Sequence, residues 1–328
     1  MRIALAGVAH WHAEMHAKAV AAAGSTLGCV WDPDIAMARR FAAMHGAAVA
    51  EELDALVTAR PDLVVAMGQA DRMPELTDLL MDAGLPIVME KPAALSAAHL
   101  APVEERARKE GHFIAVPLPN RLSPIWAEMA ALRADGRLGD LSHAQFRIIN
   151  GPPERYRRDG AGWVLDPARH GGGALRNLGI HGIDAALSLA DAAADQDIEI
   201  VGVSLDDRLY GEAVEEYAVV ILRMPGGMTV SVEAGYTYAS MEAGGDFEWR
   251  ISTRNAYLTD RGAACAVATL DDCAERTLTP LLPADRYDAF MIDTLGRIAR
   301  GEPPAVGIGD YARAMRLIDR IYQKEGCR

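Results

Sequence analysis

Short apolar runs alternate with helical periodicity along the first 118 residues. The runs that have the length of a buried strand are Ile3–Ala6, Leu27–Trp31, Leu63–Met67, Ile87–Met89 and Phe113–Val116. The segments between them have the apolar spacing of amphipathic helices, and Pro74 and Ser96 stand where two of these helices can begin. Because this alternation is typical of a parallel sheet covered by helices, we expect a doubly wound α/β domain over residues 1–118.

From Pro119 onward, apolar and polar positions alternate instead. After a predicted helix at 126–134, the strands are marked by the apolar residues Ala144, Phe146 and Ile148; Ile198 and Ile200; Tyr217, Val219 and Ile221; Met228, Val230 and Val232; and Phe247, Trp249 and Ile251. Alternation indicates a sheet with one solvated face, which favours antiparallel or mixed pairing. Two amphipathic helices follow, the second behind the predicted cap Asp310. We expect a second α/β domain over residues 119–328.

Composition fits two folded domains and narrows the possible partners. The chain has 328 residues, 50% of them hydrophobic, and a formal net charge of −13. This apolar content over this length is enough for two cores. The negative charge argues against nucleic acid and anionic membranes as partners, because both require clustered positive charge. We expect a small-molecule ligand.

Cysteine usage and the length of the apolar runs predict a cytoplasmic location. The four cysteines, Cys29, Cys265, Cys273 and Cys327, are scattered without the spacing of metal ligands, which indicates a reducing compartment. No run reaches the roughly eighteen apolar residues that a membrane span needs, and the run at Ile3–Ala6 begins too early for a signal peptide.

The first strand leads into a turn that resembles a dinucleotide site. In residues 7–12, Gly-Val-Ala-His-Trp-His, only Gly7 of the G-x-G-x-x-G pattern is kept, while Ala9 and His12 replace the second and third glycines. A strand precedes the turn, a helical pattern follows it, and Asp32 ends the second strand at the spacing of a ribose-binding acid. Asp32 favours NAD over NADP. The predicted cofactor-binding residues of the turn are Gly7, Ala9, His10 and Trp11.

Other interpretations of this region are open. Gly7 can be an ordinary turn residue, and Asp32 can cap the helix after Pro33. His12 and His16, one helical turn apart, also have a spacing suited to metal ligands. No acidic or thiol side chain nearby in the sequence completes such a set, so we favour histidines that donate to a phosphate and predict no metal.

Lys91 follows the fourth apolar run, at the carboxyl end of a predicted buried strand, where open α/β sheets form their ligand crevice. A lysine partly removed from water has a lowered pKa and can exchange a proton with a substrate hydroxyl, while Pro92 fixes the backbone beside it. The alternative is a solvated lysine at a strand end.

Four motifs are spread over the chain. They are the triplet Glu90-Lys91-Pro92, the pair Asn120-Arg121, the run Gly136-Arg137-Leu138-Gly139, and the glycines Gly171-Gly172-Gly173 that lead to His181 and Asp184. Together with the closing helices, they resemble the Gfo/Idh/MocA family of oxidoreductases over nearly the whole chain. The resemblance implies a Rossmann domain followed by an α/β domain with a large open, mostly antiparallel sheet. It also implies NAD(P)-dependent oxidation or reduction of sugars, inositols and related polyols, in a homodimer or homotetramer. We further predict that Gly68, Glu90 and Lys91 lie at the cofactor.

His181 and Asn177 are four residues apart, which puts them on one face of a helix. A histidine titrates near neutral pH, so His181 can take the hydroxyl proton as hydride leaves. A buried histidine bonded to a carbonyl is the alternative, and the resemblance favours the catalytic role. Relatives commonly carry aspartate at position 177, whose charge orients the imidazole. With asparagine there, Lys91 carries more of the proton transfer, or turnover is slow, or the substrate compensates.

The cofactor site also departs from the family pattern after Met67, where relatives often show Thr-Pro-Asn followed by histidine and this chain reads Gly68-Gln69-Ala70-Asp71-Arg72. Farther along, the segment from Arg155 to Trp163 gathers basic and aromatic side chains. Trp163 can stack on a sugar ring, and the arginines can bind an anionic substrate group. An exposed loop or a subunit contact is the alternative.

These features predict an NAD(P)-dependent dehydrogenase or reductase that acts on CH–OH groups, with Lys91 and His181 as its catalytic residues. The predicted substrate-binding residues are Arg121, Asn177, Trp163 and Asp184. Two rival functions are open. The eroded turn and Asn177 fit an NAD(P)-binding sensor without turnover, and an NAD-dependent glycosidase would oxidise its sugar only transiently.

Overall fold

The computed structural model describes residues 1–190, 192–242, 244–272 and 274–326, so Cys273 and Cys327 lie outside the described residues. The chain divides into two compact units. The first unit comprises Met1–Pro117, Tyr156–Gly171 and Tyr287–Arg316. The second unit comprises Leu118–Arg155, Gly172–Arg286 and Leu317–Arg328.

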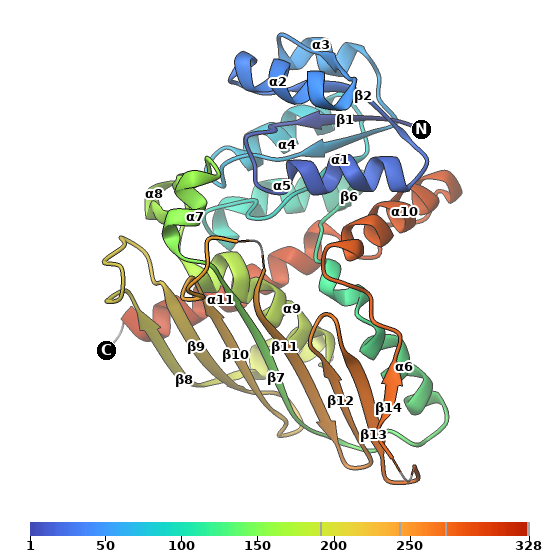
Figure 1. Cartoon of the computed structure of the whole chain (residues 1–328), viewed down its shortest axis with the longest axis vertical. Helices are drawn as coiled ribbons and strands as arrows, with labels where there is room; N and C mark the ends of the chain where they lie inside the picture. Colours follow the sequence, from blue (N-terminus) through green and yellow to red (C-terminus); the bar gives the residue numbers. More distant parts are fainter. Residues whose placement is uncertain (191, 243, 273, 327–328) are drawn as a thin grey trace. The chain divides into compact units, whose positions relative to one another are not determined.

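The strands predicted for the first unit are confirmed, and they form one parallel sheet (Figure 1). The strands are β1 (Arg2–Ala6), β2 (Thr26–Trp31), β3 (Ala48–Val49), β4 (Leu63–Ala66), β5 (Ile87–Met89) and β6 (Ile114–Ala115). Their order is β3-β2-β1-β4-β5-β6. The order reverses between β1 and β4, and in doubly wound sheets the ligand crevice opens at the carboxyl ends of such a pair. Only the two-residue strand β3 was not predicted.

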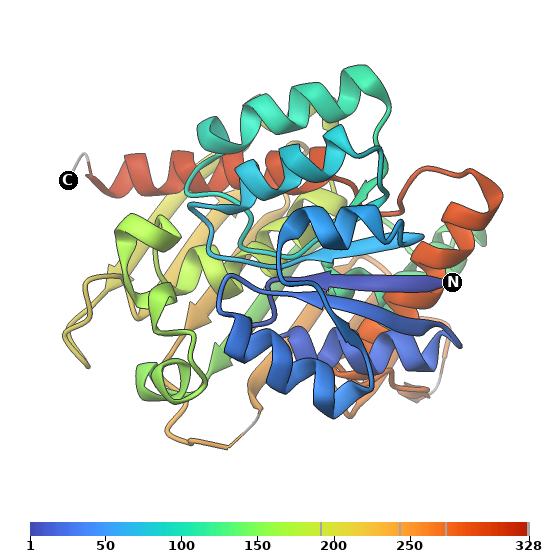
Figure 2. The same cartoon turned by 90° about the horizontal axis from the view of Figure 1, so that it is seen from above.

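Helices cover both faces of this sheet, with α1 and α2 on one side and α4 and α5 on the other (Figure 2). The helices are α1 (Ala13–Ala22), α2 (Ile35–His45), α3 (Leu53–Thr58), α4 (Met73–Asp82) and α5 (Ala97–Glu110). The predicted starts at Pro74 and Ser96 are confirmed. Pro74 lies in the first turn of α4, and the Ser96 hydroxyl accepts the His99 N–H at 3.1 Å.

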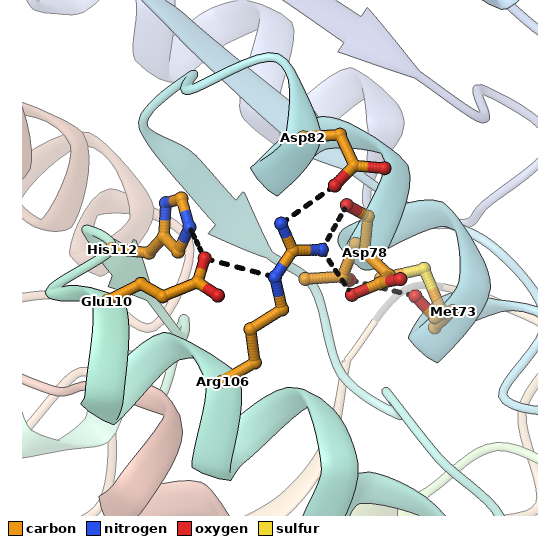
Figure 3. Close-up of polar contacts among 7 residues, drawn as sticks. Met73, Asp78, Asp82, Arg106, Glu110 and His112 are labelled. Carbon is orange, nitrogen blue, oxygen red and sulfur yellow. Dashed lines mark hydrogen bonds and ion pairs between the residues drawn. The ribbon is translucent and has the colours of Figure 1, made fainter.

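An ion-pair network joins α4 to α5 on the surface of the first unit (Figure 3). The Arg106 guanidinium lies 2.7 Å from carboxylate oxygens of both Asp78 and Asp82, and 3.1 Å from the Glu110 carboxylate. His112 binds the same Glu110 carboxylate at 2.9 Å. The side chains are partly exposed, so each pair contributes little alone, but one guanidinium shared among three carboxylates holds the two helices in register.

Segments from later in the chain complete the first unit. They include the second half of α7 (Pro153–Arg158), η2 (Gly162–Leu165), α8 (Pro167–His170), most of α10 (Asp285–Arg300) and the beginning of α11 (Ile308–Gly326). The N–H of Val116 donates to the Val306 carbonyl at 3.0 Å, and the Ala93 N–H donates to the Tyr311 hydroxyl at 3.0 Å. These bonds tie the end of the chain to the loops that follow β5 and β6.

The second unit contains a mixed, mostly antiparallel sheet of eight strands, which confirms the predicted fold class. The strands are β7 (Leu141–Asn150), β8 (Glu199–Asp206), β9 (Tyr217–Arg223), β10 (Thr229–Gly235), β11 (Gly245–Thr253), β12 (Ala256–Asp260), β13 (Cys265–Thr269) and β14 (Arg276–Leu278). Their order is β14-β13-β12-β11-β7-β10-β9-β8, and only the β7–β10 pair is parallel (Figure 1).

The two faces of the eight-stranded sheet differ in chemistry. On one face the helical segments η3 and α9 pack against β7 and β10. The helical segments that lie wholly in this unit are η1 (Pro119–Leu122), α6 (Pro124–Ala134), η3 (Leu175–Gly179), α9 (Ile180–Ser188) and η4 (Ala192–Asp197). Elsewhere on the sheet, the Glu248 carboxylate lies within 3.1 Å of the guanidinium groups of Arg147, Arg250 and Arg261. Strand side chains alternate between faces, which explains the predicted alternation.

Two local predictions are wrong. On β9 the buried residues are Ala218, Val220 and Leu222, while Ile221 is exposed. Every position from Tyr217 to Leu222 is apolar, so either alternating set of residues could face the core. The prediction took the set Tyr217, Val219 and Ile221, which is the wrong one. The second closing helix begins at Ile308, so Asp310 lies inside its first turn, where its carboxylate accepts the Gly307 N–H at 2.9 Å.

A buried ion pair lies in the core of the second unit. The guanidinium of Arg286, which is 0% exposed, binds the equally buried Asp260 carboxylate at 2.5 Å and the Asn120 side-chain oxygen at 2.8 Å. Asp260 also accepts the Ser123 hydroxyl and the Gly262 N–H. The pair therefore joins η1, the end of β12 and the start of α10 through charge-assisted hydrogen bonds.

Candidate active site

The turn after β1 is held against the end of β4 by a glycine. Gly7 has φ +88°, and a Cβ at this position would lie 1.6 Å from the Met67 carbonyl oxygen. Its N–H donates to the Trp31 carbonyl at 2.8 Å. Only glycine fits this backbone conformation and this separation. The first glycine of the dinucleotide pattern therefore brings together the carboxyl ends of β1, β2 and β4.

Asp32 fixes the same turn from the end of β2. Its carboxylate is 4% exposed and accepts the N–H of Ala9 at 2.9 Å and that of Asp34 at 2.8 Å. The cap of α2 is Asp34, which accepts the N–H groups of Ala36 and Met37, so the helix-cap interpretation of Asp32 is wrong. Burial raises the pKa of Asp32, against the backbone hydrogen bonds that lower it. Each carboxylate oxygen has a second lone pair for a ligand hydroxyl.

A pocket of about 640 Å³ opens beside this turn within the first unit. Residues that line it include Gly7, Ala9, Asp32, Gly68, Arg72 and Trp163. The structure therefore brings four of the predicted cofactor residues to one cavity. It also brings Trp163, which we had predicted to bind substrate, to the same cavity wall. This volume falls in the range of small-molecule and cofactor sites.

A carboxylate with two histidines lies beneath the turn. Glu90, 1% exposed, lies 3.1 Å from Nδ1 of His12 and 2.6 Å from Nε2 of His16. Nδ1 of His12 also lies 2.9 Å from the Tyr287 hydroxyl. Burial alone would raise the pKa of Glu90, but the two histidines hold it well below its ordinary value. Burial lowers the pKa of His12 to about 4, so a neutral ring donates to an ionised carboxylate.

This cluster explains the missing third glycine. His12 occupies that position and turns its ring to Glu90 and Tyr287 instead of crowding the turn. His12 and His16 thus bind a single carboxylate. Within the described ranges, no group of three or more His, Cys, Asp or Glu side chains is arranged to hold a metal ion.

His10, in the turn after β1, has a buried ring. Its ring is 5% exposed, and Nδ1 accepts the His12 N–H at 3.1 Å. Burial lowers the pKa of His10 well below its ordinary value, so the ring is neutral and its hydrogen lies on Nε2. Nε2 is buried and has no protein partner among the described residues. A buried N–H of this kind is satisfied when an oxygen of a ligand accepts from it.

Lys91 follows β5 and is almost completely buried. It is 2% exposed, and burial lowers the pKa of its ammonium group to about 8, against the opposing effect of Glu90. Its Nζ lies 5.5 Å from the centre of the Trp11 ring. The alternative of a solvated surface lysine is therefore wrong. An amine with a pKa near 8 can accept or donate a proton under ordinary conditions.

The helix of the second unit that carries His181 begins with an irregular turn. Residues 175–179 form the π-helical turn η3, and α9 continues from Ile180. The Glu215 carboxylate accepts the N–H groups of Gly173 and Leu175 and also binds the Tyr322 hydroxyl at 2.6 Å. A Cβ on Gly173 would lie 2.1 Å from the Glu215 carbonyl oxygen. Gly173 therefore permits close packing of this turn against Glu215. The π-helical turn is a second irregular feature, and such turns are frequent at functional sites.

The predicted residues of this helix are buried. Asn177 is 0% exposed and donates to the Tyr236 hydroxyl at 3.1 Å, while His181 is 8% exposed. Arg121 and Asp184, both predicted to bind substrate, bind each other at 2.8 and 2.5 Å through two guanidinium nitrogens. A bidentate pair of this kind orients both side chains. The substrate-binding role of these residues stays a prediction.

Three residues with hydrogen bonds to the predicted site residues were not predicted themselves. Tyr287 is a buried residue of the amphipathic helix α10, yet its hydroxyl lies 2.9 Å from Nδ1 of His12. Glu215 and Tyr236 stand far from any motif in the sequence, and their hydrogen bonds reach Gly173, Leu175 and Asn177. Long-range hydrogen bonds of this type leave no periodic signal in a single sequence.

Comparison with curated proteins finds relatives at low identity. The chain is 28% identical over 197 residues to trans-1,2-dihydrobenzene-1,2-diol dehydrogenase of Oryctolagus cuniculus, covering 60% of this chain and 56% of that protein. It is 26% identical over 190 residues to D-glucoside 3-dehydrogenase of Escherichia coli, covering 57% of this chain and 53% of that protein. The chain thus matches little more than half the length of these relatives.

Comparison with solved structures agrees on the fold. An inositol dehydrogenase homologue from Azotobacter vinelandii, solved with NAD⁺, superposes with a TM-score of 0.81 at 16% identity, covering 98% of this chain and 94% of that one. Among the residues that the structure covers, none of the helices combines the length and apolarity needed to cross a membrane.

Family models match both parts of the chain. Residues 1–117 match the NAD-binding Rossmann fold of the GFO/IDH/MocA oxidoreductase family, and residues 126–258 match the C-terminal domain of the same family. Together the two matches cover well over half of the sequence, and they agree with the parallel and mixed sheets described above. The chain is therefore a member of the Gfo/Idh/MocA family of oxidoreductases.

Proposed function

We propose that this protein transfers a hydride between a nicotinamide dinucleotide and a hydroxyl-bearing carbon of a sugar, polyol or related compound. The observation that carries the proposal is the burial of Lys91, with a pKa near 8, directly after β5 and beside the turn that follows β1. A proton-exchanging group near a dinucleotide turn is what a CH–OH dehydrogenase needs. The names of the relatives, which are dehydrogenases of diols and glucosides, support the same reaction class.

The first unit has the groups to hold NAD. Gly7 and Ala9 place no bulky side chain at the turn, the buried His10 Nε2 has no protein partner among the described residues, and Asp32 can accept from ribose hydroxyls. When bound, the nicotinamide accepts or donates the hydride at the substrate carbon. Trp163 lines the same pocket, so we now assign it to the cofactor in place of the substrate.

Proton transfer falls to Lys91 and His181 in this proposal. Neutral Lys91 takes the hydroxyl proton during oxidation, and its ammonium form returns the proton during reduction. Because Asn177 has no charge to stabilise a protonated imidazole, we assign the larger share to Lys91. Arg121, kept in place by Asp184, is available to orient a substrate oxygen.

Reduction of NAD⁺ by candidate substrates tests the proposed function. Purified protein is supplied with NAD⁺ and with cyclic polyols, pyranoses and glycosides, and reduced nicotinamide is followed by its absorbance near 340 nm, a property of the cofactor itself. We expect net reduction of NAD⁺ with at least one substrate of this panel. Tight NAD⁺ binding without turnover across the panel would favour the sensor, and aglycone release without net reduction would favour the glycosidase.

Asp32 is expected to set the preference for NAD over NADP. Asp32, Asp34 and Glu75 line the pocket against a single arginine, Arg72, so the ribose end is acidic and disfavours a 2′-phosphate. Replacing Asp32 with alanine removes hydrogen bonds to a charged group worth about 1.5–3 kcal/mol, which corresponds to a rise in the NAD Kd of about 10- to 100-fold.

Calorimetric titration of both dinucleotides into wild type, Asp32→Ala and Asp32→Asn measures this preference. Asparagine keeps an acceptor for the Ala9 N–H but loses the charge. We expect the NAD-to-NADP affinity ratio to fall in both variants and the NAD affinity to fall less in Asp32→Asn. An unchanged ratio in Asp32→Ala would remove the ribose-binding role.

A further inference from the structure

Trp11 lies at the turn beside the ammonium group of Lys91. The Lys91 Nζ lies over the indole, 5.5 Å from the centre of the ring, which is within the range of a cation–π contact. Lys91 is buried and Trp11 is only half-buried. Such a contact is strongest where water is excluded, because the ring face then replaces part of the lost hydration of the cation.

The indole is itself fixed by other rings. His10 stacks on it with ring centres 3.9 Å apart and planes at 21°. Trp163 lies 5.6 Å away, and Tyr156 meets the indole edge to face at 6.0 Å. Since burial keeps His10 neutral, its ring holds the indole in place without repelling the Lys91 ammonium. Trp11 is therefore a rigid aromatic surface.

We propose that Trp11 is a positioning residue that holds the Lys91 ammonium by a cation–π contact and so aims the group that exchanges a proton with the substrate. This inference rests on the proposed function for its catalytic part, but the contact itself does not. The charged and titratable groups of the first unit that act on Lys91 include Glu90, His10 and His12, and the variants below leave all three unchanged.

The contact can be measured directly because lysine is rare in this chain. Lysine occurs only at positions 18, 91, 109 and 324, and all but Lys91 are exposed. Protein labelled with ¹³Cε-lysine therefore gives four side-chain signals, and Lys91→Met identifies the one from Lys91. We expect the Lys91 ε protons of the protein without added cofactor to lie upfield of the others, because the indole ring current shields a group above its face.

Two substitutions at Trp11 distinguish the effect of the aromatic ring from the effect of side-chain volume. Trp11→Phe keeps a smaller ring, and Trp11→Leu removes it. We expect the Lys91 signal to move to the range of the exposed lysines in Trp11→Leu and to keep part of its shift in Trp11→Phe. We also expect the titration midpoint of that signal, near 8 in wild type, to fall by on the order of one unit in Trp11→Leu and by less in Trp11→Phe.

Turnover tests the positioning role. We expect kcat to fall about tenfold in Trp11→Leu and less in Trp11→Phe, because the substitutions disturb the orientation of the Lys91 amine. The KM should change by less than about threefold. A wild-type Lys91 signal that coincides with the exposed lysines, or that is unmoved in Trp11→Leu, overturns the contact. Equal kcat in the two variants overturns the positioning role. If wild type turns over no substrate, the proposed function fails while the spectra still decide the contact.

Discussion

Lys91→Met is expected to lower kcat by about 10²- to 10⁴-fold, the usual contribution of a positioned acid or base. Methionine keeps much of the length of the side chain but cannot carry a proton. The Kd for NAD should change by less than tenfold, because the pocket beside Gly7 and Asp32 is untouched. Steady-state kinetics with the best substrate, together with calorimetric titration of NAD, measures both quantities.

The dependence of kcat/KM on pH tests the same role of Lys91. Burial lowers the pKa of Lys91 to about 8, and only the neutral amine can take a proton. In wild type, kcat/KM for oxidation should therefore fall about tenfold per pH unit below 8 and level off above it, and reduction should show the opposite trend. Lys91→Arg is the matched control, since it keeps the charge but does not titrate in this range. Full activity of either variant would show that Lys91 is not the acid/base group.

Arg286→Met is expected to destabilise the second unit by about 3–5 kcal/mol, because it leaves the Asp260 carboxylate as a buried charge without its partner. Both side chains are 0% exposed, so no water compensates for the loss. Guanidinium unfolding followed by circular dichroism measures the change, in the transition that includes the eight-stranded sheet.

Two control variants separate burial from ion pairing. The exposed pair Arg254–Asp140 is joined at 2.8 Å, with side chains 71% and 83% exposed, so Arg254→Met should cost less than about 1 kcal/mol. The double variant Arg286→Met/Asp260→Leu should recover much of the loss, since it removes both buried charges. If Arg286→Met lowers the free energy of unfolding by no more than Arg254→Met does, the predicted effect of burying the ion pair is wrong.

Much of the fold could be predicted because its signal is local. Runs such as Leu63–Met67 and Ile87–Met89 are short, apolar and bounded by turn residues, and the observed strands fall within them. Strand β3 has only two residues, which is too short for any period to register. On β9 each position from Tyr217 to Leu222 is apolar, so composition alone does not say which face is buried. That choice is made by the helices that pack on the sheet, which are distant in sequence.

The part of the candidate site around the turn after β1 could be predicted, because the spacing of residues in that motif determines where they lie. Gly7, Ala9 and Asp32 were selected from spacing, and they line one pocket. The position of Trp163 on the wall of this pocket was harder to predict, because residues 156–171 belong to the first unit although the strand before them belongs to the second. Glu90 was selected only through the family resemblance, and its histidine partners depend on contacts across more than seventy residues.

Asp32 has a consequence for how this enzyme can change. Under the proposed function, the Asp32 carboxylate that lines the pocket binds a ribose hydroxyl, and it also accepts the Ala9 N–H, so coenzyme preference and the conformation of the turn depend on one side chain. A lineage that loses this acid to a side chain without an acceptor also loses the hydrogen bond to the turn. Such drift, or a redesign in the laboratory, therefore keeps the turn in place only if asparagine at position 32, or a second substitution, supplies an acceptor for the Ala9 N–H.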